Sequence, residues 1–149
     1  MAIIRKATIK DISRIAEILV FTKRMNYRCI FHDDQVSFGE MQVLPTAKEY
    51  EDNPHSLDTY WVYEDGFVKG LINIDEGEIK ELYVDDFFHS EGIGSKLIDF
   101  AIKEHSVKYL WVLEKNEKAI GFYKKHGFSM SKERQLEEGT TEYIVKMER

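Results

Sequence analysis

The sequence predicts an α/β fold in which an antiparallel β-meander is followed by a helical crossover to a further strand. Three observations support this prediction. The N-terminal part has an amphipathic helical pattern. Period-two segments in the middle are joined by turns at Asp65-Gly66 and Glu76-Gly77. Two helical patterns then flank an apolar, β-rich segment, which gives the order β-α-α-β-β-β-α-β-α-β-β.

Hydrophobic periodicity and breaker residues place each element in turn. Thr8 with Asp11 resembles a capping box, Pro45 suits a first helical turn, and Gly127 suits a helix end. His126 lies at that end, where a cation suits the helix dipole. The expected elements are a strand at 2–7, a helix from the Thr8 cap to about 24, an irregular stretch at 25–44, a short helix at 45–53, strands at 59–64, 67–74 and 78–84, a helix at 93–105, a strand at 107–113, a helix at 116–126, and strands beginning at 128 and spanning 140–146.

Size and composition limit the function classes. The 149 residues suit one domain and contain no repeat or linker, so residues 1–149 are expected to form a single domain. A net charge of −6 disfavours nucleic-acid binding, and no segment resembles a signal peptide or membrane span. The single cysteine, Cys29, is interpreted as a small apolar residue and indicates a reducing compartment, so we expect a cytoplasmic protein with no membrane partner.

Residues 82–97 carry the most informative pattern, because a strand ends there and a glycine pair opens a helix. Free N–H groups and the positive end of the helix dipole predict a phosphate-sized anion site at Ser90–Ser95. Spacing excludes a P-loop and a dinucleotide fingerprint, since Leu97 stands where either would need glycine. A plain loop-to-helix junction remains the alternative. His32-Asp33-Asp34 is interpreted as a polar loop, with no metal site expected.

A second pattern, N-x-x-A-x-x-F-Y-x-x-x-G-F, runs from Asn116 to Phe128. Together with ELYV at 81–84 and SEGIGSKL at 90–97, it resembles the acetyl-CoA signature of the GNAT superfamily of N-acetyltransferases. The resemblance implies a mixed sheet of about six to seven strands, an antiparallel meander followed by a parallel splayed pair, flanked by about four helices. It also implies acetyl-CoA as cosubstrate, without a metal.

The resemblance also assigns cofactor contacts. The strand residues Leu82, Tyr83 and Val84 would offer backbone groups to the pantetheine arm and the acetyl carbonyl. Asn116 would contact the cofactor, and it also suits an N-cap. His89 stands where the family usually has Arg or Gln, so we expect weaker binding sustained by backbone donors, with His89 either contacting phosphate or solvated. The loop that would wrap the pyrophosphate comprises Ser90, Glu91, Gly92, Ile93, Gly94 and Ser95.

Catalytic candidates follow from the same resemblance. Tyr123 corresponds to a tyrosine near the cofactor sulfur and is expected to act as general acid toward the departing thiolate; a core tyrosine is the alternative. Glu81 is the leading general-base candidate, against a solvated strand residue, with Glu40 and Asp75 as further options. Glu114 is expected to be solvated.

The predicted activity is direct acetyl transfer to a primary amine of an unidentified acceptor, with a small molecule favoured. Trp111 replaces an acid found in some protein-acetylating members, which argues against that subgroup. Protein or peptide acetylation and a non-catalytic acyl-CoA sensor or interaction module remain alternatives. Dimers are frequent in the family, so a homodimer is a prior expectation. Residues 25–53, the meander and the C-terminal hairpin are expected to form an acidic, aromatic acceptor pocket for a cationic amine, using Tyr27, Phe31, Asp33, Asp34, Phe38, Glu40, Tyr60 and Trp61.

Overall fold

Seven strands form one mixed sheet in the computed structural model, which describes residues 1–149 except the side chains of Tyr27, Cys29 and Phe31. The expectations for those three side chains lie outside the described residues. The sheet order is β1-β2-β3-β4-β5-β7-β6, with β4 and β5 parallel and every other neighbouring pair antiparallel. The strands are β1 (Ile3–Lys6), β2 (Tyr60–Asp65), β3 (Phe67–Asp75), β4 (Glu78–Val84), β5 (Tyr109–Leu113), β6 (Ser129–Leu136) and β7 (Tyr143–Glu148).

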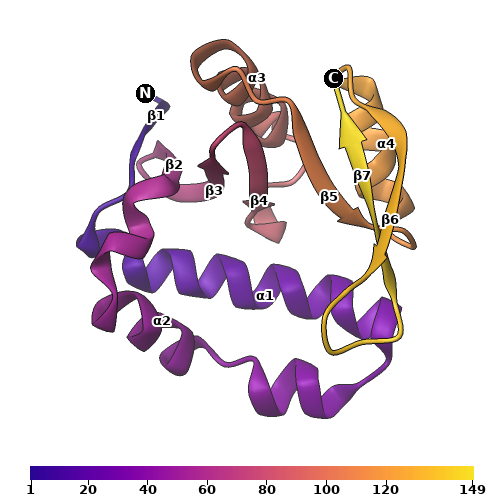
Figure 1. Ribbon diagram of the computed structural model, residues 1–149. Coiled ribbons are helices and arrows are strands. Elements are labelled where there is room, and N and C mark those ends of the chain that lie inside the picture. The colour runs from indigo at the N-terminus through magenta and orange to yellow at the C-terminus, as the bar shows by residue number, and fades with distance from the viewer.

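Helices cover both faces of the sheet. The helices α1 and α2 lie together along one face, while α3 lies on the opposite face (Figure 1). None of the helices in the described part of the chain is long and apolar enough to cross a membrane. The sheet order and the helices on its two faces confirm the predicted mixed sheet with about four flanking helices. The helices are α1 (Ile12–Phe31), α2 (Val43–Asp52), α3 (Ile93–His105) and α4 (Glu117–Lys125), with a π-helical turn at Gln35–Glu40 and a 3₁₀ segment at Pro54–Thr59.

The first two helices differ from their predicted bounds. The Thr8 backbone N–H donates to Asp11 Oδ2 at 2.8 Å, which confirms the predicted cap. The helix α1, however, continues past residue 24 to Phe31. The apolar pattern that predicted it stops earlier, because Thr22, Lys23 and Asn26 on its inward face are polar and line a cavity. The helix α2 begins before Pro45, which occupies its third position, where the N–H would have no intrahelical partner.

Two apolar layers hold the sheet between the helices. The α1 residues Ile15 and Ile18 pack with Val62 and Leu71 from the meander. On the other face, α3 packs against β3 and β4. Gly70 on β3 permits this close approach, because a Cβ there would lie 3.1 Å from Ile93 and 3.2 Å from Leu97. The core thereby fixes where α3 begins.

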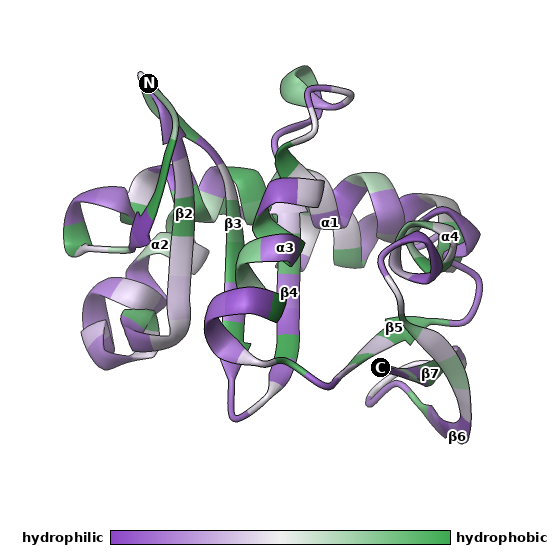
Figure 2. Cartoon of the chain, turned by 90° about the horizontal axis from the view of Figure 1, so that it is seen from above, coloured by the Kyte–Doolittle hydropathy of each residue, from purple (hydrophilic) through white to green (hydrophobic). Residues whose placement is uncertain are grey.

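The parallel strands β4 and β5 separate soon after they meet. They pair only at Glu78 with Tyr109 and at Ile79 with Leu110. Figure 2 shows the two strands diverging from that point. Next to it, Asn73 pairs with Glu81 while Ile74 pairs with Ile79, so Lys80 is the extra residue of a β-bulge in β4. The predicted splay between these strands is confirmed.

Candidate active site

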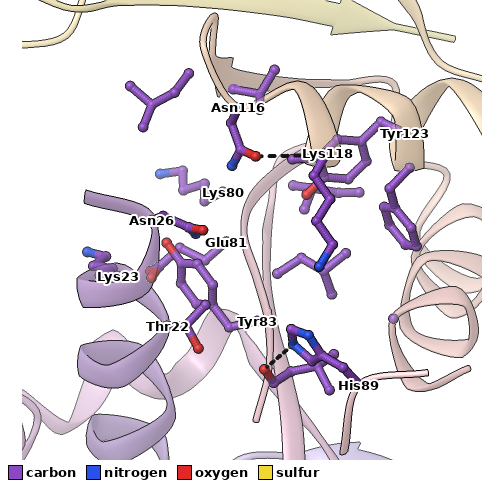
Figure 3. Close-up of a pocket in the computed structure, with 18 of the residues that line it drawn as sticks. Thr22, Lys23, Asn26, Lys80, Glu81, Tyr83, His89, Asn116, Lys118 and Tyr123 are labelled. Carbon is purple, nitrogen blue, oxygen red and sulfur yellow. Dashed lines mark hydrogen bonds between the residues drawn. The ribbon is translucent and has the colours of Figure 1, made fainter. Parts of the chain in front are cut away.

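A cavity of about 740 Å³ lies between the diverging strands. Its walls are β4 and β5, the second half of α1, the start of α3, and α4. Figure 3 shows α1 side chains facing β4, with Asn116, Lys118 and Tyr123 on the opposite wall. Among the residues predicted to bind the cofactor, Glu91 alone does not line the cavity; its carboxylate lies 4.0 Å from Lys69 Nζ. The predicted site residues that do line it are Glu81, Leu82, Tyr83, Val84, His89, Ser90, Gly92, Ile93, Gly94, Ser95, Asn116 and Tyr123.

The start of α3 presents backbone N–H groups to this cavity. Gly92 is the N-cap, with a φ of 78°, and no side chain caps the helix there. The N–H groups of the first helical turn therefore lack intrahelical acceptors and remain able to bind an anion. Gly94 lies in this turn and lets α3 pack closely against α4, since a Cβ at this position would lie 3.4 Å from the Phe122 ring. These features suit a phosphate-bearing ligand.

His89 and Asn116 each have a structural contact that bears on their predicted roles. His89 Nε2 lies 3.0 Å from the Val84 carbonyl oxygen, so the imidazole binds the last carbonyl of β4. Its Nδ1 lies 3.5 Å from Asp86. The Asn116 side chain accepts a hydrogen bond from Ala119 N–H at 3.2 Å and caps α4. The capping role of Asn116 is confirmed, and cofactor contact by either residue stays a prediction.

Glu81 is held by hydrogen bonds from the neighbouring strands. Its Oε1 accepts a hydrogen bond from the Tyr60 hydroxyl and one from Asn73 Nδ2 at 3.4 Å. Its Oε2 is buried and has no hydrogen-bond partner among the described residues. Glu81 is therefore an oriented carboxylate in the cavity wall rather than a solvated strand residue.

The Tyr123 side chain lines the cavity from α4 and packs among aromatic rings. Its ring lies 5.3 Å from the Phe122 ring and 6.0 Å from the Phe128 ring, measured between centroids. Burial raises the pKa of the Tyr123 hydroxyl well above its ordinary value, because the phenolate would be poorly solvated. The hydroxyl therefore carries its proton at neutral pH.

The other acids considered as bases do not line the cavity. Glu114 accepts two hydrogen bonds from Arg134, at 2.6 and 2.9 Å, on the exposed surface. Asp75 pairs with Lys80 at 3.0 Å. Glu40 is exposed in the π-helical turn. Among the candidates weighed from the sequence, Glu81 alone lies in this wall.

Asn26, Glu137 and Ile144 line the cavity from segments that were expected to form the acceptor pocket, whereas the described aromatic and acidic residues expected there do not. Tyr60 lies behind Glu81 in the core, and Trp61 packs on the other face against Phe100, with centroids 5.0 Å apart. Phe38 lies beside the Arg24 guanidinium, 5.2 Å from it. The residues expected there that do not line the cavity are Asp33, Asp34, Phe38, Glu40, Tyr60 and Trp61.

The helix α1 supplies cavity residues that sequence reasoning missed. Thr22, Lys23 and Asn26 line the cavity next to Glu81 and Tyr83 (Figure 3). They continue, at helical spacing, the same face that is apolar at its start. This polar end of an apolar stripe was the signal available in the sequence.

His126 and Lys118 were also missed as neighbours of the site. His126 Nε2 lies 3.1 Å from Ser95 Oγ, and its ring lies 4.7 Å from the Phe122 ring centroid. Lys118 lines the cavity close to His89 (Figure 3). No local signal marked either residue, because both contacts depend on how α4 packs against α3.

A splayed parallel strand pair, a cavity between its strands and an uncapped helix start beside it form the arrangement that the resemblance to the GNAT superfamily implies. The chain belongs to the GNAT acetyltransferase family: the family described as "Acetyltransferase (GNAT) domain" matches residues 56–130. The family predicted from residues 78–128 is thus confirmed.

Two curated relatives and one solved structure illustrate the similarity. The chain is 34% identical over 92 residues to "Probable N-acetyltransferase Rv2775" of Mycobacterium tuberculosis, covering 52% of this chain and 53% of that protein. It is 36% identical over 70 residues to "Peptidyl-lysine N-acetyltransferase YiaC" of Escherichia coli, covering 46% and 48%. The matches thus span about half the length of these relatives. PaiA N-acetyltransferase from Thermoplasma acidophilum, solved in complex with coenzyme A, has the same fold, with a TM-score of 0.68 and 17% identity over 100% of this chain and 99% of that one.

Proposed function

We propose that this protein transfers the acetyl group of acetyl-CoA directly to a primary amine of a small molecule. One observation carries the proposal: the cavity joins the open helix start of α3 to an oriented carboxylate, Glu81, and a protonated phenol, Tyr123. An anion-binding end and two proton-transfer groups are what amine acylation by a phosphate-bearing thioester requires.

The residues present fit acetyl-CoA. The first turn of α3, which no side chain caps, would bind the pyrophosphate through its N–H groups. The free edge of β4 beyond Ile79 would bind the pantetheine arm, because β5 does not pair there. When bound, acetyl-CoA supplies an activated acetyl thioester. The coenzyme A complex of the structurally similar Thermoplasma protein supports this assignment.

Glu81 and Tyr123 have complementary tasks in this proposal. Glu81 accepts the proton that the acceptor ammonium must lose, directly or through water. Tyr123 donates its hydroxyl proton to the leaving sulfur, and its apolar surroundings keep it protonated until then. His89 holds the end of β4 through the Val84 carbonyl.

Peptide lysine is the second candidate acceptor. The similarity to the peptidyl-lysine acetyltransferase YiaC favours it. Trp111 in the cavity wall favours a small-molecule acceptor, because it stands where some protein-acetylating members have an acid.

Calorimetric titration with acetyl-CoA, with NADH as the control, followed by an amine and lysine-peptide screen for CoA release, tests the proposal. We expect micromolar binding of acetyl-CoA alone and amine-dependent CoA release. Faster release with peptides than with any small amine would favour the second candidate. Binding without release under every acceptor would point instead to a non-catalytic acyl-CoA sensor and contradict the proposal.

Replacing Glu81 by Gln tests the base assignment. Gln keeps the size of the side chain but cannot accept the proton, so kcat/KM should fall by about 10²-fold or more, with acetyl-CoA affinity little changed. Glu114→Gln is the matched control, because that exposed acid lies outside the cavity. A normal pH–rate profile in Glu81→Gln would remove Glu81 from the mechanism.

A further inference from the structure

Two buried tyrosines, Tyr50 and Tyr60, form a hydrogen-bonded chain that ends at the partly buried Glu81. The Tyr60 hydroxyl donates to Glu81 Oε1, and the Tyr50 and Tyr60 hydroxyl oxygens lie 2.8 Å apart. The two rings pack edge to face, with centroids 5.6 Å apart. Tyr60 and Tyr50 are 4% and 9% exposed, so water does not compete for these hydroxyls. The chain runs from α2 through β2 to the cavity wall on β4.

The number of hydroxyl hydrogens decides which residue donates in each hydrogen bond between Tyr50, Tyr60 and Glu81. A phenol carries one hydrogen, and Tyr60 gives it to the Glu81 carboxylate. The Tyr60 oxygen can therefore only accept from Tyr50, so the Tyr50 hydroxyl donates. Burial raises the pKa of Tyr50 to about 12 and that of Tyr60 further, so both remain donors at neutral pH.

The arrangement leaves one Glu81 oxygen fixed and the other open. Oε1 accepts from Tyr60 and Asn73, whereas Oε2 has no partner among the described residues. A buried carboxylate with an empty lone pair is costly unless something binds it in the working protein. In a wall of the cavity, the acceptor amine or its water is the group that would do so.

We infer that Tyr60, itself held by Tyr50, is a positioning residue that fixes Oε1 of Glu81 and so directs its Oε2 toward the acceptor amine. The inference rests on the proposed acetyl transfer. It extends that proposal to two residues behind the cavity wall that contact neither cofactor nor acceptor.

Other charged and titratable groups line the cavity with Glu81 or adjoin its tyrosine partners, and none of them is changed in the variants below. Only a change relative to the unmodified protein is therefore informative. These groups are Lys23 on α1, Glu49 on α2, Glu78, Lys80 and Tyr83 on β4, and Glu137 in the C-terminal hairpin.

The test compares pH profiles of kcat/KM for the unmodified protein, Tyr60→Phe and Tyr50→Phe. Without the hydrogen bond from Tyr60, the Glu81 carboxylate should take up a proton more readily. The acid limb of the kcat/KM profile of Tyr60→Phe should therefore shift to higher pH by about one to two units. Tyr50→Phe should shift it less, in the same direction. Activity lost at neutral pH should return at higher pH.

Tyr63→Phe is the matched control, because it removes a buried hydroxyl from the same strand on the opposite sheet face. Its acid limb should not move. Thermal unfolding of all three variants identifies any folding loss. A merely structural role would lower stability and leave the acid limb in place in Tyr60→Phe, which would overturn the inference.

A direct titration separates this inference from the proposed function. Carbon-13 NMR of the Glu81 carboxyl, assigned with Glu81→Gln, reports its protonation without any acceptor. A higher midpoint in Tyr60→Phe supports the positioning role even if no amine releases CoA, in which case the proposed function alone fails. An unchanged midpoint overturns the inference whatever the activity.

Discussion

At the residue scale, the Tyr123 hydroxyl is the group whose chemistry is most easily isolated. Tyr123→Phe keeps the ring contacts to Phe122 and Phe128 and removes the proton donor. We expect kcat to fall by about 10²-fold, with the Kd for acetyl-CoA within about twofold, because the donor acts on the leaving thiolate. Steady-state kinetics and calorimetry measure the two quantities. Tyr109→Phe, outside the cavity, is the control; an unaltered kcat in Tyr123→Phe would make Tyr123 a core tyrosine.

The site residues differ in how far the sequence could reveal them. Gly92, Gly94 and Asn116 were predictable, because helix starts have local signatures. The bond between Tyr60 and Glu81 was not, since strand register brings the two residues together. The aromatic strand residues expected at the acceptor pocket, Tyr60 and Trp61, lie outside the cavity for the same reason. In a two-faced sheet, one step along a strand decides whether a ring meets α1 or α3, as Tyr60 and Trp61 show.

At the element scale, the junction of β3 and α3 controls where the anion-binding helix begins. A Cβ at Gly70 would lie 3.1 Å from Ile93, 3.2 Å from Leu97 and 3.2 Å from the Tyr83 carbonyl oxygen. Gly70→Ala should therefore displace α3, lower the free energy of unfolding by about 1–3 kcal/mol and weaken acetyl-CoA binding. Chemical denaturation and calorimetry measure these effects.

Gly121→Ala is the matched control for that substitution. A Cβ at Gly121 would meet nothing within 4 Å, and the residue lies inside α4. Ala should therefore raise the free energy of unfolding by about 0.5–1 kcal/mol through helix propensity and leave cofactor affinity unchanged. Equal stability of Gly70→Ala and the unmodified protein would show that α3 does not depend on this contact.

Element boundaries were predictable where a turn residue marked them. The strand β4 and the helix α3 have the predicted bounds, because Glu76-Gly77 and Gly92 interrupt the chain sharply. The end of α1 was missed, since its inner face becomes polar where it meets the cavity rather than where the helix ends. The β-bulge at Lys80 was not predicted from the sequence. It places Ile79 and Leu82 in the same core layer, so the side chains of β4 do not simply alternate between the two faces of the sheet.

At the scale of the whole molecule, one guanidinium joins the edge strand, the meander and the first helix. Arg5 on β1 donates to Asp11 at 2.8 and 2.9 Å, where α1 begins, and to Glu64 on β2 at 3.0 Å. These hydrogen bonds from Arg5 hold the pKa of Asp11 below its ordinary value. Because α1 forms one wall of the cavity, the hydrogen bonds of Arg5 also help to fix the position of that wall.

The lowered pKa of Asp11 fixes how stability depends on pH. A carboxylate whose pKa is depressed on folding stabilises the protein above its unfolded pKa of about 3.9, and that contribution disappears as pH falls through the folded value. Asp11→Asn should therefore cost about 1–3 kcal/mol of unfolding free energy at pH 7, and the difference from the unmodified protein should shrink below about pH 4. Urea unfolding across pH measures it, with Asp52→Asn, an exposed acid 3.5 Å from Lys48, as control. A difference that stayed constant down to acidic pH would mean that Asp11 acts through packing, and the cavity wall would then not depend on this ion pair.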